Sequence, residues 1–227
     1  MKRTIRVFSL LLAAVMLLSA QALATEPAQA VTDVEHSGQY LCGLPRVEPA
    51  QAFTDVTKQD YFYDAVNWTV EKEITSGVSK DVFAPNQDCT RADFVTFLWR
   101  AAGKPVVNYA MSFSDVKESS YYAEAVRWAA SLGIVTGLSK NTFGAANAVT
   151  REQAATMLWR FAKQQGFDTT QGGLAIREYN DYDSLSEYAR EAMAWAVNTE
   201  ILKGANNRLL PDAACTRAQL VTLLYRL

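Results

Sequence analysis

Apolar side chains recur at helical spacing in paired segments between residues 51 and 227. In the stretch "YFYDAVNWTVEKEI", Tyr63, Val66 and Val70 mark a stripe with a period near 3.6, which predicts an amphipathic helix. The next patterned stretch, "TRADFVTFLWR", carries apolar residues on most of its surface, including Leu98 and Trp99 near its end. A short helix of that kind is expected to be buried on nearly all sides. The pattern therefore predicts an outer helix, a loop and a buried helix.

This unit is written three times along the chain. Each copy holds a tryptophan, an isoleucine six residues later and a glycine nine residues later: Trp68, Ile74 and Gly77; Trp128, Ile134 and Gly137; Trp195, Ile201 and Gly204. An aromatic-x-Asp element precedes each tryptophan, with Asp55, Asp115 and Asp181, and a Thr-Arg pair follows each glycine, with Arg91, Arg151 and Arg217. We therefore divide the chain into repeats at 51–105, 111–166 and 177–227.

The repeats predict an all-α fold. Gly- and Asn-rich loops such as "TSGVSKDVFAPNQD" end the first helices, and their alternation is too weak to predict strands. A unit of about 50 residues buries too little apolar surface alone, so the three should fold as one body. We expect the three second helices to form a central bundle with the first helices outside. The five tryptophans are assigned to the core rather than to sugar stacking, because each lies among apolar neighbours.

An arginine stands in the first turn of each second helix, where the positive end of the helix dipole disfavours a cation. Thr90 is the expected N-cap there, and the pairs Thr90/Asp93, Thr150/Gln153 and Thr216/Gln219 are expected capping boxes.

Two interpretations of these arginines stay open. In one, Arg91, Arg151 and Arg217 join the free helix N–H groups to bind a carboxylate or phosphate, and Gly77, Gly137 and Gly204 let the ligand approach the backbone. In the other, the arginines pair with Asp55, Asp115 and Asp181 and tie each unit together.

The N-terminal part of the chain has the pattern of a secretory signal peptide. Residues 1–24 have a basic start, an apolar run too short for a typical membrane span and an Ala-x-Ala end. Residues 25–50 are interpreted as a linker or an N-terminal strap. Without residues 1–24, 19 Lys and Arg stand against 24 Asp and Glu, a formal charge of −5. This acidic balance disfavours nucleic acid and anionic lipid as partners.

The residues that could carry chemistry are few. Cys42, Cys89 and Cys215 have no metal-ligand spacing, although a disulfide between Cys89 and Cys215 stays open if the helix starts converge. The staple interpretation, in which Cys89, Val149 and Cys215 pack on their helices, also stands. The single histidine, His36, provides no triad or zinc site, so we expect no catalysis, no metal and no cofactor.

The order and spacing of these motifs resemble the S-layer homology family in three tandem repeats. The resemblance rests on aromatic-x-Asp-Val, the mid-repeat tryptophan, Gly-Ile-x-x-Gly and a Thr-Arg-Ala-Glu motif. Here that last motif appears as Thr90-Arg91-Ala92-Asp93, Thr150-Arg151-Glu152-Gln153 and Thr216-Arg217-Ala218-Gln219. No copy has the family's Glu, which puts any ligand contact of that side chain in doubt. The second copy alone keeps Gly-Ile, at Gly133 and Ile134, and is the most family-like.

The resemblance implies a fold and a function. It implies a three-pronged, pseudo-threefold body that anchors a secreted protein without a covalent bond to the cell wall or S-layer. The expected partner is an anionic cell wall polysaccharide attached to peptidoglycan, with pyruvate-ketal sugars as its acidic groups, held in grooves between repeats. Groove walls are expected from Tyr61, Tyr63, Tyr121, Tyr122 and Tyr182. The alternative is a structural surface-layer protein that assembles with itself or with an envelope protein partner without glycan.

Overall fold

The computed structural model describes residues 53–227, and this part of the chain is all-α. The first helix of each repeat is α1 (Tyr63–Glu71), α3 (Ala123–Ser131) or α5 (Arg190–Asn198). The second is α2 (Arg91–Ala101), α4 (Arg151–Gln164) or α6 (Arg217–Tyr225). The third repeat adds the 3₁₀ turns η1 (Ala175–Glu178), η2 (Tyr182–Ser184) and η3 (Glu187–Ala189). The expectation of an all-helical fold is confirmed for these residues.

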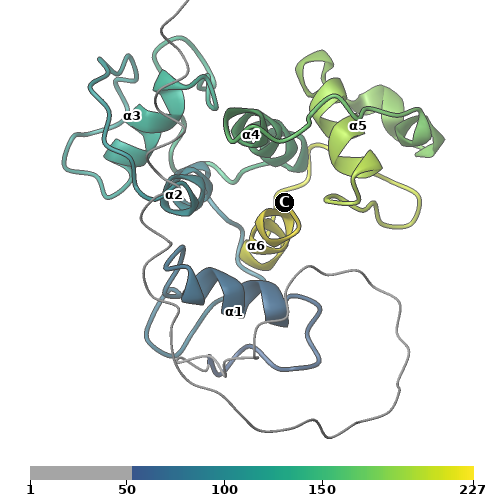
Figure 1. The fold of residues 1–227 in the computed structure, drawn as a ribbon, viewed down its shortest axis with the longest axis horizontal. Helices are drawn as coiled ribbons and strands as arrows, with labels where there is room; N and C mark the ends of the chain where they lie inside the picture. Colours follow the sequence, from purple (N-terminus) through teal and green to yellow (C-terminus); the bar gives the residue numbers. More distant parts are fainter. Residues whose placement is uncertain (1–52) are drawn as a thin grey trace, which may run out of the picture. The chain divides into compact units, whose positions relative to one another are not determined.

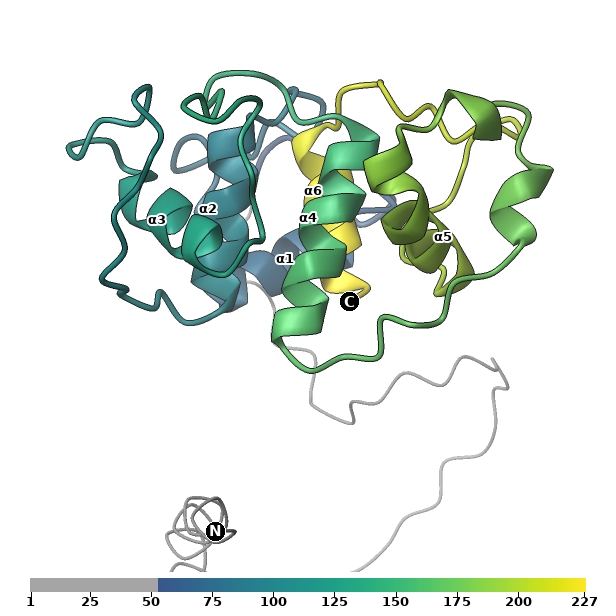
Figure 2. The ribbon, with the colours of Figure 1, turned by 90° about the horizontal axis from the view of Figure 1, so that it is seen from above.

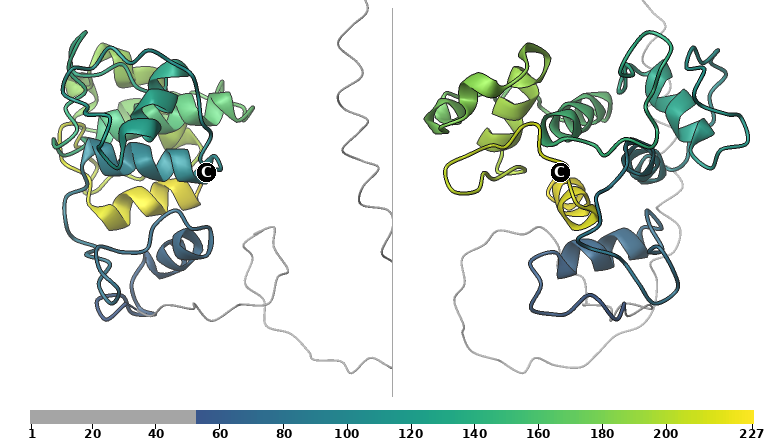
Figure 3. Two further views of the ribbon diagram at one scale, coloured as in Figure 1. Left: turned by 90° about the vertical axis from the view of Figure 1, so that its left-hand side faces the viewer. Right: turned by 180° about the vertical axis from the view of Figure 1, so that it is seen from behind.

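The first helix of each repeat packs on the second helix of a different repeat. Helix α3 packs on α2, α5 on α4, and α1 returns to pack on α6 at the other end of the chain. Helices α2, α4 and α6 lie side by side, with α1, α3 and α5 outside them (Figures 1 and 2). The views from the side and from behind show the same order (Figure 3). The repeat of the sequence is therefore not the packing unit.

A closed set of backbone hydrogen bonds joins the three repeats just before the second helices. Cys89 N–H donates to the Cys215 carbonyl at 2.9 Å, and Cys215 N–H donates to the Val149 carbonyl at 2.9 Å. Val149 N–H donates to the Cys89 carbonyl at 3.0 Å, which completes the set. All three residues are buried, so these polar groups satisfy one another where water is absent. The three helix starts converge, but the disulfide between Cys89 and Cys215 that the sequence left open is not formed.

The second helices start at the predicted N-caps. The hydroxyls of Thr90, Thr150 and Thr216 accept from the backbone N–H groups of Asp93, Gln153 and Gln219. Only the third copy forms the complete capping box, in which Gln219 accepts from Thr216 N–H at 3.1 Å. The expected boxes of copies one and two are wrong in their second half. The Asp93 carboxylate accepts instead from the hydroxyls of Thr90 and Tyr121, and the Gln153 side chain bonds to an arginine.

The core joins residues from all three repeats. Trp128 and Trp195 are buried in it, as expected, whereas Trp68, Trp99 and Trp159 are partly buried against it. None of the helices described over residues 53–227 is long and apolar enough to cross a membrane. The predicted signal peptide at 1–24, the linker at 25–50, His36 and Cys42 lie outside the described residues.

Candidate functional site

Each first-turn arginine bonds to a loop of the following repeat. Arg91 Nε donates to the Phe143 carbonyl at 3.0 Å and Arg151 Nε donates to the Leu209 carbonyl at 2.7 Å. Arg217 Nε closes the cycle by donating to the Phe83 carbonyl of the first repeat at 2.9 Å. These carbonyls explain why a cation is tolerated at a helix N-terminus, because each one offsets the unfavourable dipole with a charge-assisted hydrogen bond.

The aspartates hold the same loops from within their own repeats. Asp115 accepts from the N–H groups of Phe143 and Gly144 at 2.8 and 2.7 Å. Asp55 and Asp181 accept in the same way from residues 83–84 and 209–210. The ion pairs of the second interpretation, between these aspartates and the first-turn arginines, do not occur among the described residues. The aspartate holds the N–H side of the loop residue, and the arginine from the preceding repeat holds its carbonyl.

These loop contacts lower the pKa of the Asp115 carboxyl. Burial alone would raise the pKa of its carboxyl, but the N–H groups of Phe143 and Gly144 and the nearby charge of Arg91 lower this pKa below its ordinary value. The carboxylate is thus held in its charged form. Asp115 and Arg91 are coupled through the loop and through space without direct contact.

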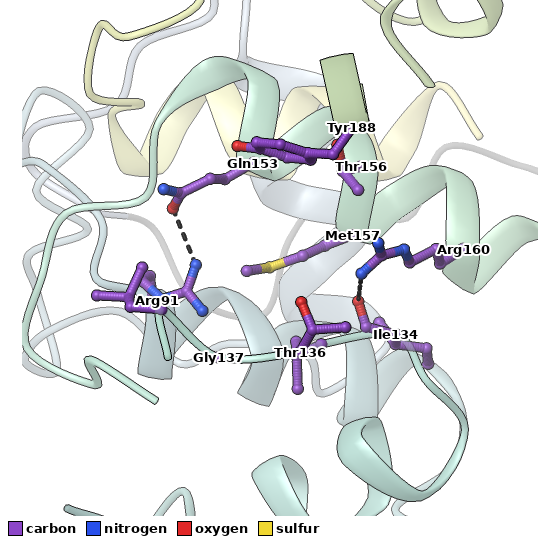
Figure 4. Close-up of a pocket in the computed structure, with 11 residues that line it drawn as sticks. Arg91, Ile134, Thr136, Gly137, Gln153, Thr156, Met157, Arg160 and Tyr188 are labelled. Carbon is purple, nitrogen blue, oxygen red and sulfur yellow. Dashed lines mark hydrogen bonds between the residues drawn. The ribbon is translucent and has the colours of Figure 1, made fainter. Parts of the chain in front are cut away.

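A cavity of about 300 Å³ opens where Arg91 meets the second repeat. Two guanidinium groups line it, those of Arg91 and Arg160, with Met157 between them (Figure 4). The remaining side chains and backbone of its wall come from the loop and helix of the second repeat and from one tyrosine of the third. These are Ile134, Val135, Thr136, Gly137, Leu138, Gln153, Thr156 and Tyr188. The cavity therefore collects residues from all three repeats.

Arg91 is almost enclosed and still keeps a donor for a ligand. The residue is 3% exposed, and burial lowers the pKa of its guanidinium, although arginine remains charged in proteins. Its Nη1 donates to Gln153 Oε1 at 2.9 Å, whereas Nη2 has no acceptor among the described residues. Every fully enclosed side-chain polar atom in this part of the chain has a partner. Nη2 is therefore not enclosed, and the cavity that Arg91 lines gives it access to a ligand.

Arg160 supplies the second charge with a looser attachment. Its Nη1 donates to the Ile134 carbonyl at 3.4 Å, at the long end of hydrogen-bond distances. Burial lowers the pKa of its guanidinium, and the neighbouring Tyr188 opposes that shift. The cavity thus presents two positive charges whose protein contacts leave donors unused, which is suited to a carboxylate or phosphate oxygen.

The predicted glycines are explained first by packing. A Cβ on Gly137 would stand 2.6 Å from Phe113 Cε1 and 2.7 Å from the Thr142 carbonyl oxygen, and its φ is +74°. Gly77 and Gly204 are crowded in the same way by the aromatic-x-Asp ring and the loop of their own repeats. Gly137 also lines the cavity. The glycine therefore closes the loop against the ring, and approach of a ligand to it stays a prediction.

A second cavity, of about 600 Å³, has the opposite charge. Asp93 and Asp115 line it together with Tyr121 and Tyr122, and no lysine or arginine does. Tyr121 OH donates to Asp93 Oδ1 at 2.6 Å. An anion is expected to avoid this cavity because the two aspartates repel it. Of the two cavities, the one at Arg91 is therefore the better candidate for an acidic ligand.

The other candidates from the sequence are the two cysteines of the repeats, possible metal ligands and the five tyrosines. The thiols of Cys89 and Cys215 are buried and free, and burial raises the pKa of Cys215 to about 12 and also raises that of Cys89. No group of three or more His, Cys, Asp or Glu side chains within residues 53–227 could hold a metal ion. Tyr61 and Tyr121 are exposed, as a groove wall requires, whereas Tyr63, Tyr122 and Tyr182 are half-buried.

The sequence interpretation missed two residues of the cavity, and each carried a repeat signal. Tyr188 stands seven residues before Trp195, the place that Tyr61 and Tyr121 occupy before their tryptophans. Arg160 belongs to the sequence "LWR", a pattern that returns as "LWR" and "LYR" in the other copies. Both residues follow from a stricter alignment of the three copies.

The fold and the cavity define a class: within the described residues, an all-helical repeat module with a cavity lined by two arginines. The family model for the S-layer homology domain matches residues 52–95, 112–155 and 178–221, more than half of the chain. The chain belongs to the S-layer homology family and holds three of its domains in tandem, as the resemblance predicted.

Relatives in this family are enzymes and surface proteins. The chain is 28% identical over 171 residues to an amylopullulanase from Thermoanaerobacterium thermosulfurigenes, covering 75% of the chain and 9% of that enzyme. It is 26% identical to the surface-layer 125 kDa protein of Lysinibacillus sphaericus, over 73% of the chain and 14% of the relative. It is 24% identical to a cellulosome-anchoring protein of Acetivibrio thermocellus, over 66% of the chain and 34% of the relative. The chain spans only a small part of these relatives, so their catalytic names are not transferred.

Proposed function

We propose that this protein is secreted and anchors itself to the cell wall by binding an acidic wall polysaccharide in the cavity at Arg91. The observation that carries the proposal is the pair of guanidinium groups at one cavity, with Arg91 Nη2 free of protein acceptors. Because Nη2 reaches the cavity, an anion that enters can accept a charge-assisted hydrogen bond from it. A sugar acid supplies such an anion.

The ligand class follows from the charge and size of the cavity. A volume of about 300 Å³ is at the small end of ligand sites, which suits one sugar unit rather than a long stretch of polymer. A pyruvate ketal places a carboxylate on a sugar ring, and a carboxylate can accept hydrogen bonds from a guanidinium. We therefore favour a pyruvylated polysaccharide attached to peptidoglycan. The names of the surface-layer and cellulosome-anchoring relatives support attachment to the envelope.

The proposal includes a pseudo-threefold relation among the repeats. It is supported by the cyclic pairing of helices and by the three equivalent arginine-to-carbonyl bonds. Under this relation, Arg151 with Arg226 and Arg217 with Arg100 correspond to Arg91 with Arg160.

Sedimentation with purified wall sacculi tests this function. The wild-type protein should sediment with native sacculi and stay in solution after hydrofluoric acid has stripped the secondary polymer. Arg160→Ala should weaken retention about tenfold with a nearly unchanged melting temperature, because its one long hydrogen bond contributes little to folding. The matched control is Lys140→Ala, which removes an exposed charge from the same repeat outside the cavity.

Two results would count against the proposal. Equal retention on stripped and native sacculi would favour assembly with an envelope protein, the alternative function. Equal retention of wild type and Arg160→Ala on native sacculi would remove the cavity from the binding site.

A further inference from the structure

Glu152 is a buried carboxylate that occurs in only one of the three repeats. It occupies the second position of α4, where α2 has Ala92 and α6 has Ala218. The residue is 4% exposed. A charge buried so deeply needs strong partners, so its presence in one copy alone calls for a local explanation.

The partners of Glu152 all come from the third repeat. Ser186 donates its backbone N–H to Oε2 at 3.1 Å and its hydroxyl to Oε1 at 2.8 Å. Tyr188 donates its hydroxyl to Oε1 at 2.8 Å. Three donors and the N-terminal end of α4 compensate the buried charge. The carboxylate therefore attaches the turn around η3 to the start of α4.

This attachment determines where the ring of Tyr188 stands. Tyr188 lines the cavity at Arg91, and its hydroxyl is held by Glu152. The residue is 52% exposed, so part of its ring remains open to a ligand. In Figure 4 the ring lies on the same side of Met157 as Gln153, across the cavity from Thr136 and Gly137. Burial and the hydrogen bond to Glu152 raise the pKa of the Tyr188 hydroxyl, which keeps it a proton donor at neutral pH.

We propose that Glu152 is a positioning residue that holds Tyr188 as the wall of the Arg91 cavity, so that the third repeat completes a site otherwise built by the first two. The inference rests on the proposed function and deepens it. A ligand sugar in the cavity packs its apolar face on the ring of Tyr188 while its acid meets the arginines. The equivalent Tyr121 is held by the carboxylate of Asp93 and lines the second, acidic cavity, whereas Tyr188 lines the cavity with the two arginines. The Arg91 cavity thus combines a preorganised aromatic wall with two positive charges.

The experiment is a double-mutant cycle with Glu152→Gln and Tyr188→Ala. Its probe is a synthetic methyl glycoside that carries a 4,6-linked pyruvate ketal, titrated by calorimetry. Each single variant is expected to weaken binding about tenfold. Because Glu152 acts through the tyrosine, Glu152→Gln should have no further effect in the Tyr188→Ala background. Glu191→Gln, an exposed acid in the first turn of α5, is the matched control and should bind like wild type.

Additive losses in the cycle would overturn the positioning role, since they would mean that Glu152 acts independently of the ring. Fluorine NMR of protein labelled with 3-fluorotyrosine gives a readout that needs no ligand. Tyr188→Phe identifies the Tyr188 resonance by its loss, and Glu152→Gln should shift that resonance. An unmoved resonance would refute the proposal even if the variant melts lower.

The two proposals fail separately. If wild type does not bind the glycoside or the sacculi, the proposed function is wrong, and the fluorine resonance still decides whether Glu152 holds Tyr188. If wild type binds and Glu152→Gln binds equally well, only the positioning role is wrong.

Discussion

Replacing Arg217 by alanine should destabilise the whole body, because this side chain joins the third repeat to the first. Arg217 is 5% exposed and donates Nε to the Phe83 carbonyl at 2.9 Å across 134 residues of sequence. Its guanidinium carbon also lies 5.0 and 5.6 Å from the ring centroids of Phe83 and Phe97. The substitution removes these three contacts and a long hydrogen bond from Nη2 to Thr75 Oγ1 at 3.5 Å, and it leaves the Phe83 carbonyl without its partner.

The magnitude follows from these contacts. Losing a hydrogen bond from a charged donor costs about 1.5–3 kcal/mol. Each cation–π contact adds about 0.5–1 kcal/mol. The free energy of unfolding should therefore fall by about 2.5–5 kcal/mol. For a body of this size, each kcal/mol lowers the melting temperature by about 2–4 °C, so a loss of roughly 5–20 °C is expected.

The assay is urea unfolding followed by circular dichroism, together with thermal melts. Arg217→Lys keeps the charge but removes the Nε–H group, so it should lose most of the same stability. Lys117→Ala, at an exposed position, is the control and should change the free energy of unfolding by less than about 0.5 kcal/mol. A loss below about 1 kcal/mol for Arg217→Ala, or full retention in Arg217→Lys, would refute the reasoning that the bond to Phe83 closes the body.

Three further outcomes are expected. In urea unfolding, Gly137→Ala should lower the free energy of unfolding more than Gly133→Ala does, because both glycines have positive φ but only a Cβ at Gly137 would meet other atoms within 4 Å. Equal losses of free energy in the two variants would contradict the packing role of Gly137. The Cys89 thiol should resist iodoacetamide until the protein unfolds, and Cys89→Val should fold normally because Val149 fills the equivalent place. The pKa of the Asp115 carboxyl is lower in the folded protein than in the unfolded chain, so its contribution to stability is present above about pH 3.9 and is lost as the pH falls through the folded pKa. In melts at pH 2–5, the melting temperature of Asp115→Asn should therefore fall less with decreasing pH than that of wild type. The same pH dependence in both proteins would contradict this prediction.

The helices and the repeat could be predicted because their signals are local. Thr90 as an N-cap depends on its own side chain and the next three residues, and the apolar period of each helix is complete within about ten positions. The partner of each helix was not predictable in this way. An apolar stripe indicates that one face of a helix is buried but does not identify the helix that covers it. Only the structure shows that α1 packs against α6.

The arginine site shows the same limit at the level of side chains. An ion pair between Arg91 and Asp55 of the same repeat was a reasonable alternative from charge alone, but the Asp55 carboxylate already accepts from two loop N–H groups and Arg91 donates to Phe143 of the next repeat. The Gln153 capping bond failed because Arg91 of another repeat competes for the same oxygen. In both places a contact between repeats replaces one within a repeat.

The most direct test of the central claim is a calorimetric titration of wild-type protein with the pyruvate-ketal glycoside and with its methyl ester. The two compounds have nearly the same shape and differ by one negative charge. The account expects the acid to bind, the ester to bind at least about tenfold more weakly, and Arg160→Ala to reduce this difference. Equal binding of the acid and the ester would contradict the claim that the cavity at Arg91 recognises an anion.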